Sequence, residues 1–156
     1  MPFQISGLPL EQFSPLFALG ADELRRRDII RVTADHCPGF PCRVSLRDAQ
    51  PGETLMLLNF EHQPARSPYR SRHAIYVREN AAPAQLQPGE IPDVLATRLL
   101  SIRAFDRTGM MIEADVVDGR DLAAAIERMF TLPSVDYLHL HNAKPGCFAA
   151  RADRLR

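Results

Sequence analysis

The sequence contains no tryptophan and only three cysteines, and Lys144 is the one lysine among its 19 basic residues. Three cysteines are an odd number and too few for a disulfide-stapled scaffold, so we expect free thiols in a reducing cytoplasm. The 19 acidic residues balance the basic ones, which gives no general attraction to nucleic acid or to an anionic membrane. No run approaches the roughly 20 apolar residues of a membrane helix. The first residues lack a basic region followed by an apolar core, and we therefore expect no signal peptide.

Several common catalytic motifs are also absent. The sequence has no GxGxxG, no GxxxxGK[ST] and no GxSxG, so dinucleotide-binding, P-loop and hydrolase-elbow functions lack support. Its three tyrosines and eight phenylalanines fall mostly at positions with apolar periodicity. Such positions indicate core residues rather than platforms on which nucleobases stack, and we expect no nucleic-acid partner.

The remaining composition is typical of one globular domain. Apolar residues make up 46% of the 156 positions and charged residues 24%. A chain of this size buries roughly 70% of its unfolded surface. Without repeats or low-complexity tracts, residues 1–156 are expected to form a single domain.

Short elements are predicted in the first two thirds of the chain. Runs of β-branched and aromatic residues predict strands at 28–35, 54–61 and 73–79. Residues 62–72 form the connection between the last two, and loops of that length are often functional. Helical turns are expected near ADELRRRD and near residues 93–98.

The last third shows clearer periodicity. Alternation predicts a hairpin between 99–105 and 111–117, with Arg103 opposite Glu113 as a favourable cross-strand pair. An amphipathic helix over 121–130 is predicted by apolar residues three and four positions apart: Leu122, Ala125, Ile126, Met129 and Phe130. The fold class is therefore α+β, with a mixed, mainly antiparallel sheet of five to seven short strands and this helix packed on one face.

A second hairpin is predicted near the C-terminus, with strands at 135–141 and 147–152 on either side of NAKPG. Pairing Leu140 with Phe148 makes one face apolar. The other face then carries Tyr137, His139, His141, Cys147, Ala149 and Arg151.

This register places His141 directly opposite Cys147. An imidazole beside a thiol can stabilise the thiolate, which is the nucleophilic form. The minimal catalytic assignment is Cys147 as nucleophile, His141 as its base and His139 as orienting group or second base. Arg103 or Arg151 would bind an anionic substrate group. The alternative is that the cysteine is a small buried hydrophobic residue and the histidines are structural.

The same hairpin could instead hold zinc or iron. Two imidazoles at alternate strand positions point the same way, and Cys147 would complete a three-ligand set. Glu113 or Asp115 could join if the two hairpins are neighbours. Because no HExxH motif or pair of CxxC units is present, no residue is assigned as a metal ligand.

A second candidate site lies in the loops of the first half. Clustered arginines with a tyrosine could form a rim that binds phosphate or carboxylate. Its members are Cys42, Arg43, Arg47, His62, Arg66, Tyr69, Arg70, Arg72 and His73. Arg43, Tyr69 and Arg70 are the predicted ligand-binding residues, together with Arg103 and Arg151. The alternative is that these arginines are solvated or paired with local acids.

Four segments together resemble the bacterial family known as "domain of unknown function 1203". They are PGFPCRVSLRDAQPGE, LLNFEHQPARSPYRSRHAIYVRE, LSIRAFDRTGMMIEADVVDG and LHLHNAKPGCFAARADR. The resemblance implies a stand-alone cytoplasmic bacterial protein. It implies no activity and no residue roles.

Three functions follow from these patterns. The first is a small-molecule enzyme or ligand-binding domain, with thiol chemistry as one form, whose polar groove is lined by His139, His141, Cys147 and nearby arginines. A small anionic molecule is its candidate ligand. The second is a non-catalytic module whose exposed loops contact another protein, and the third is a metal-binding protein. The sequence identifies no cofactor and does not decide between an enzyme and a binding protein.

Overall fold

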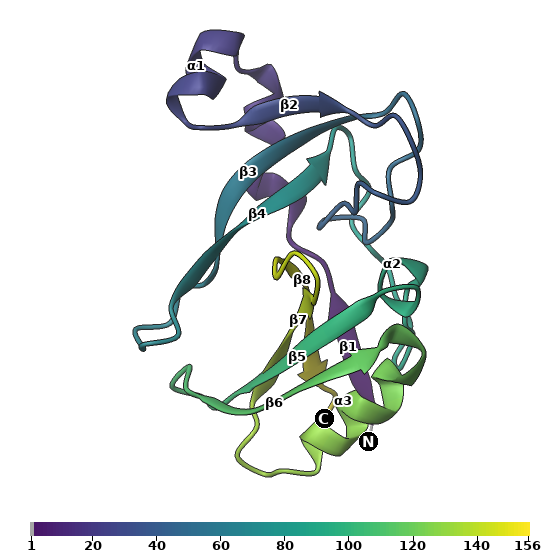
Figure 1. The fold of residues 1–156 in the computed structure, drawn as a ribbon. Helices are drawn as coiled ribbons and strands as arrows, with labels where there is room; N and C mark the ends of the chain where they lie inside the picture. The colour runs from purple at the N-terminus through teal and green to yellow at the C-terminus, as the bar shows by residue number, and fades with distance from the viewer. Residues whose placement is uncertain (1) are drawn as a thin grey trace.

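The computed structural model describes residues 2–156 and contains eight strands and several short helices (Figure 1). The strands are β1 Phe3–Ser6, β2 Ile30–Thr33, β3 Thr54–Gln63, β4 Ser71–Arg78, β5 Leu99–Phe105, β6 Met111–Asp118, β7 Tyr137–Asn142 and β8 Phe148–Arg154. The α-helices are α1 Ala21–Arg26, α2 Asp93–Ala96 and α3 Leu122–Phe130, and the 3₁₀ helices are η1 Leu10–Gln12, η2 Ser14–Ala18 and η3 Gly119–Asp121.

The strands form two antiparallel sheets. One has five strands in the order β1-β8-β7-β5-β6, and the other has three in the order β2-β3-β4. The predicted α+β class with a mainly antiparallel sheet is confirmed. The chain leaves the first sheet after β1, builds the second sheet, and returns to complete the first (Figure 1).

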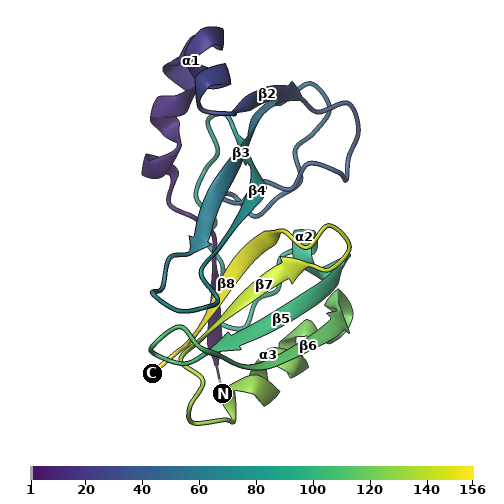
Figure 2. The ribbon, with the colours of Figure 1, turned by 60° about the vertical axis from the view of Figure 1, so that its left-hand side comes forward.

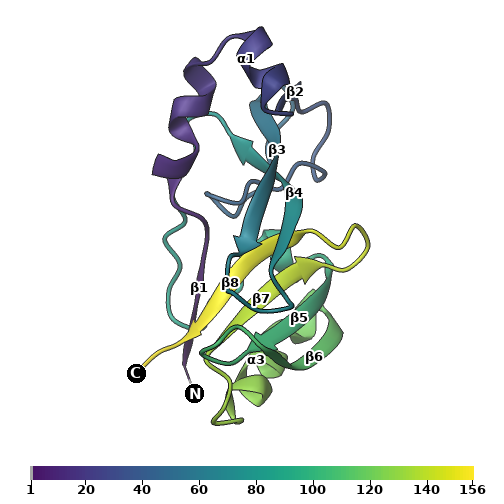
Figure 3. The ribbon, with the colours of Figure 1, turned by 90° about the vertical axis from the view of Figure 1, so that its left-hand side faces the viewer.

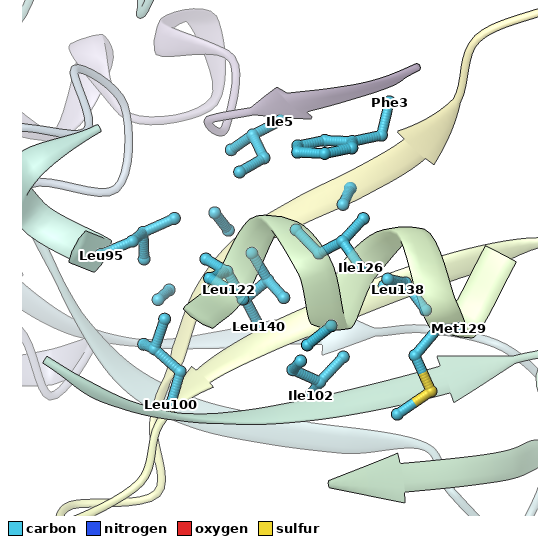
Figure 4. Close-up of a cluster of buried hydrophobic side chains, with 14 of the residues drawn as sticks. Phe3, Ile5, Leu95, Leu100, Ile102, Leu122, Ile126, Met129, Leu138 and Leu140 are labelled. Atoms are coloured by element: carbon cyan, nitrogen blue, oxygen red, sulfur yellow. The ribbon is translucent and has the colours of Figure 1, made fainter. Parts of the chain in front are cut away.

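Helix α3 packs on the five-stranded sheet and forms the larger hydrophobic core (Figure 4). All five residues of its predicted apolar face are buried. They contact the inward side chains of the sheet, among them Ile102, Leu138 and Leu140. The helix follows η3 directly, whose start is capped by the Asp118 carboxylate accepting from the Arg120 amide.

The predicted register between β5 and β6 is wrong by one residue. Arg103 lies opposite Ala114 rather than Glu113, because an irregularity between Ala104 and Phe105 shifts the pairing. Strand β6 is a largely exposed edge strand, so apolar alternation does not define its register.

The β7–β8 hairpin also differs from its predicted register. Leu140 pairs with Ala150 rather than Phe148, a shift of two residues. The predicted faces are therefore wrong at two positions, because Phe148 lies against the histidines and Ala149 belongs to the core under α3. A bulge between Leu140 and His141 then brings His141 opposite Phe148. Cys147 precedes β8 in the turn, so the predicted His141–Cys147 pair is not formed.

The connection between β3 and β4 is shorter than predicted. Strand β3 continues to Gln63 and β4 begins at Ser71, so both ends of the expected loop belong to strands. The end of this hairpin lies against the five-stranded sheet near β7 and β8 (Figures 2 and 3). The Ser67 hydroxyl donates to the Gly109 carbonyl in the β5–β6 turn at 2.8 Å, which anchors the hairpin there.

None of the helices in residues 2–156 combines the length and the hydropathy needed to cross a membrane.

The core under α3 predicts how strongly the loss of a buried side chain destabilises the protein. Ile126 is fully buried, and replacing a buried isoleucine by alanine lowers the free energy of unfolding by about 2–5 kcal/mol. The same change at Ile30, which is 57% exposed on an edge strand, should cost less than about 1 kcal/mol. Urea denaturation of both variants checks this; equal losses would contradict the assigned core.

Candidate functional site: a buried histidine cluster

Three histidines meet where the β3–β4 hairpin lies against the five-stranded sheet. His62 comes from β3, and His139 and His141 come from β7. One ring nitrogen from each lies within 4.8 Å of the others. The three residues are 8%, 3% and 0% exposed, so water does not hydrate these rings freely.

Strand geometry explains how β7 contributes two members. His139 and His141 occupy alternate positions, which places both imidazoles on the face opposite the core. His139 lies between Arg103 on β5 and Arg151 on β8, its two cross-strand partners. The prediction that these two histidines share a face is therefore confirmed.

His62 joins the cluster from the second sheet. The ladder between β3 and β4 is irregular between Phe60 and Gln63, and His62 and Gln63 are consecutive buried residues as a result. A bulge re-aims side chains in this way. His62 stacks between His73 and Phe148, with ring centroids 4.7 Å and 5.2 Å away. These stacks fix its orientation.

Hydrogen bonds occupy one nitrogen on each of two rings. His141 Nδ1 lies 2.9 Å from the Gly146 carbonyl oxygen, so this nitrogen is the one that carries the proton. His62 Nε2 lies 2.6 Å from His73 Nδ1. Within residues 2–156, three other buried nitrogens have no partner: His62 Nδ1, His139 Nδ1 and His141 Nε2.

Burial keeps these imidazoles neutral. Desolvation is the largest cause that lowers the pKa of His62 to about 4, of His139 to about 3 and of His141 to about 2. The Arg103 guanidinium lowers all three further. Since a neutral imidazole offers a lone pair, the cluster presents metal-ligand atoms near neutral pH.

Arg103, the cross-strand partner of His139 on β5, is a cation without a counter-charge in the part of the chain that the structure describes. It is half-buried, its pKa is lowered by burial, and its Nε donates to Ser101 Oγ at 3.3 Å. In residues 2–156 no carboxylate lies within ion-pair distance of it. Arg151, by contrast, pairs with Asp153 and lies over the Tyr137 ring.

The structure places Cys147 outside the cluster. Its sulfur accepts a hydrogen bond from Arg43 Nη2 at 3.0 Å, and Asn142 Nδ2 lies 3.8 Å away. The group of three that the sequence offered as an alternative had this cysteine as its third member, whereas the structure brings His62 to His139 and His141. The cross-strand pair from which His141 was assigned as the base of Cys147 is not formed.

The residues of the second candidate site, the arginines and the tyrosine of the first half, differ in their surroundings. Tyr69 and Arg70 lie at the surface, and Arg70 makes a two-pronged contact with Glu61 at 2.9 and 3.3 Å. Arg43 is buried far from them in the sequence and bonds to the β7–β8 hairpin. Arg70 is thus paired with a local acid, as in the alternative given for these arginines.

His62 and His73 are the residues whose role sequence reasoning missed. The sequence predicts His62 in the loop and His73 at the start of a strand, and the structure places both in strands. Alternation along β3 breaks near its end, and such a break beside a histidine was the available signal for a bulge.

Comparison with known proteins gives a family and nothing further. A family model described as "Protein of unknown function (DUF1203)" matches residues 39–154. This range includes every histidine of the cluster. No curated protein and no solved structure matches the chain.

The lowered pKa values predict a pH-dependent stability in metal-free protein. Histidine in an unfolded chain has a pKa of about 6.5, so below that pH the unfolded state binds more protons than the folded one. The free energy of unfolding is therefore highest above pH 6.5. It falls with the pH until each folded-state pKa is passed, at about 4 for His62, about 3 for His139 and about 2 for His141. Each buried histidine should lower the free energy of unfolding by up to about 1.4 kcal/mol per pH unit.

Urea denaturation between pH 7 and pH 5 measures this slope. His139→Gln should reduce it by one histidine's share, whereas His36→Gln, at a ring that is 65% exposed, should leave it unchanged. A free energy of unfolding that stays constant from pH 7 to pH 5 would contradict the buried, neutral cluster.

Proposed function

Since the chain belongs to the DUF1203 family, whose description names no activity, we propose its function from the geometry of its own residues. The protein binds a divalent transition metal ion, Zn²⁺ first, through His62, His139 and His141. The metal centre serves a small-molecule reaction or binding event.

Two observations support this proposal: one ring nitrogen from each of three buried histidines converges with the others, and each of the three rings has a buried nitrogen without a hydrogen-bond partner in residues 2–156. A buried polar atom without a partner costs about 1–3 kcal/mol. A metal ion accepts a lone pair from each of three imidazoles at once, and thereby compensates all three. If the role were only structural, we would expect hydrogen-bond partners for these nitrogens, as for nearly all buried polar groups.

The hydrogen bond on His141 fits a ligand's role. Metal-ligating histidines usually donate their other ring N–H to a carbonyl or carboxylate, which fixes the tautomer and the ring orientation. The Gly146 carbonyl provides that acceptor for His141. His73 provides the corresponding contact for His62.

Three imidazoles favour zinc, copper, iron or nickel over calcium or magnesium, which prefer oxygen. Three protein ligands also leave a coordination position for water or a substrate oxygen, as in catalytic rather than structural zinc sites. No carboxylate belongs to the donor set, and Arg103 adds positive charge nearby. The remaining ligand should therefore be anionic, such as hydroxide or a substrate oxyanion.

A convergent polar cluster supports the small-molecule function over the interaction module. We also propose the cytoplasm as its compartment, which the three free cysteines support.

A second candidate function is thiol chemistry at Cys147, favoured by the guanidinium of Arg43 on its sulfur. A cation beside a thiol favours nucleophilic reactivity. If this chemistry operates, iodoacetamide at pH 7 modifies Cys147 faster than the exposed Cys37, and Arg43→Lys slows the reaction at Cys147 alone. Peptide mass spectrometry measures both rates. A Cys147 that reacts only after unfolding would remove this candidate.

Metal binding is tested first by elemental analysis of protein purified without a metal-affinity tag. We expect close to one zinc per chain. After chelation, titration with Co²⁺ should restore a site with the visible absorption of a four-coordinate ion. His139→Gln and His141→Gln should each weaken binding by at least about 100-fold, and His73→Gln by about 10–100-fold because it only orients His62.

His36→Gln is the matched control, since this exposed histidine bonds to Asp35 outside the cluster. Its affinity should equal that of the parent chain. Circular dichroism checks that each variant is folded. Protein that holds no metal as purified and takes up neither Zn²⁺ nor Co²⁺ at micromolar concentrations would end the proposal.

A further inference from the structure

A cavity of about 780 Å³ lies beside the histidine cluster. Its walls come from the loop before Val44, from β4, from the start of β5 and from the β7–β8 turn. His73 lines it and also bonds to His62 of the cluster. Cavities of roughly 300–1,000 Å³ are the usual size of small-molecule sites.

The charged side chains that line this cavity are all basic. Arg43, Arg98 and Lys144 contribute, and no aspartate or glutamate lines it. Arg98 has a counter-charge, because it pairs with Asp48 at 2.7 Å. Among residues 2–156, neither Arg43 nor Lys144 has a carboxylate within 4.0 Å.

Arg43 is the more informative of the two cations, because it is only 2% exposed. Its guanidinium donates to the carbonyls of Phe148 and Pro41 at 2.7 and 2.6 Å and to Cys147 Sγ at 3.0 Å. With Cys147 as a neutral thiol, these contacts hold the group in place but bring no full negative charge. Buried charges are ordinarily paired, since desolvating one alone is costly. An anion in the cavity would complete the pair.

The rest of the lining is mainly apolar. Leu57, Tyr76, Leu99 and Pro145 contribute hydrocarbon or ring surface. Asn142 also lines the cavity, and its buried Oδ1 has no hydrogen-bond partner in residues 2–156. The lining thus combines an apolar wall, two unpaired cations and an amide acceptor.

We infer that this cavity binds a small organic anion, whose carboxylate or phosphate group lies near Arg43 and Lys144 and whose apolar body lies against Tyr76 and Leu99. The inference does not require the metal, because none of the three proposed metal ligands lines the cavity. His73 lines the cavity and also bonds to His62, so the two sites are neighbours.

The test uses three probes of similar size on chelator-treated protein: phenyl phosphate, phenylacetate and the neutral phenylacetamide. Backbone amide shifts of Thr97, Ala143 and Lys144 in ¹⁵N NMR spectra report binding, since all three residues line the cavity. We expect saturable shifts with at least one anion and none with phenylacetamide. The anion that binds more tightly identifies the head group as phosphate or carboxylate.

Lys144→Gln should weaken anion binding at least about threefold, and Lys144→Arg should restore it. Lys144 is exposed in a turn, so both variants are expected to fold. Arg120→Gln is the control, because Arg120 is exposed and pairs with Asp118 away from the cavity. Equal binding of phenylacetamide and the anions, shifts confined to other residues, or no binding at all would overturn the inference. Because the protein is treated with chelator, the outcome does not depend on bound metal, which separates this result from that of the metal experiment.

Discussion

The desolvation of polar groups at the contact between the two sheets is the constraint on which the site depends. The end of the β3–β4 hairpin covers the polar face of the five-stranded sheet, and this contact takes His62, His139 and His141 out of water. Removed from water, the imidazoles lose protons at lower pH, and nitrogens without partners become costly. Hydrogen bonds to Gly146 and His73 compensate part of that cost. A bound metal would compensate the rest.

The same contact explains the buried Arg43. Its guanidinium reaches from the loop before β3 to the β7–β8 hairpin and bonds to the Phe148 carbonyl and the Cys147 sulfur. A contact made only of apolar side chains would bury neither a guanidinium nor imidazoles. Buried imidazoles and a buried guanidinium at one contact support the proposed metal site and the proposed anion site beside it.

Local patterns in the sequence were sufficient for most of the fold. The periodicity of α3, the alternation of β5 and β7 and the turn residues between them each predict an element that the structure contains. Register was less predictable, because each of the three hairpins has an irregularity: after Phe60, after Ala104 and after Leu140. One inserted residue changes the pairing without changing which residues are apolar. The sequence also did not show that the strands divide into two sheets.

Only the part of the site that lies on one strand, β7, was predictable from the sequence. Two-residue alternation placed His139 and His141 on one face, and that prediction needed no knowledge of the other sheet. The choice of Cys147 as their partner depended on a cross-strand pair that the structure does not contain. His62 is distant in the sequence and reaches the cluster through a bulge and a sheet-to-sheet contact, neither of which local patterns report. Arg43 and Cys147 were both singled out, but their contact is also long-range.

The central claim is that these three imidazoles bind one metal ion. Crystals of zinc-loaded protein, with diffraction data collected at the zinc absorption edge, test it most directly. The account predicts one strong anomalous peak, about 2.0–2.1 Å from a ring nitrogen of each of His62, His139 and His141. A peak that lies instead on the Cys147 sulfur, or only on surface residues, would contradict it.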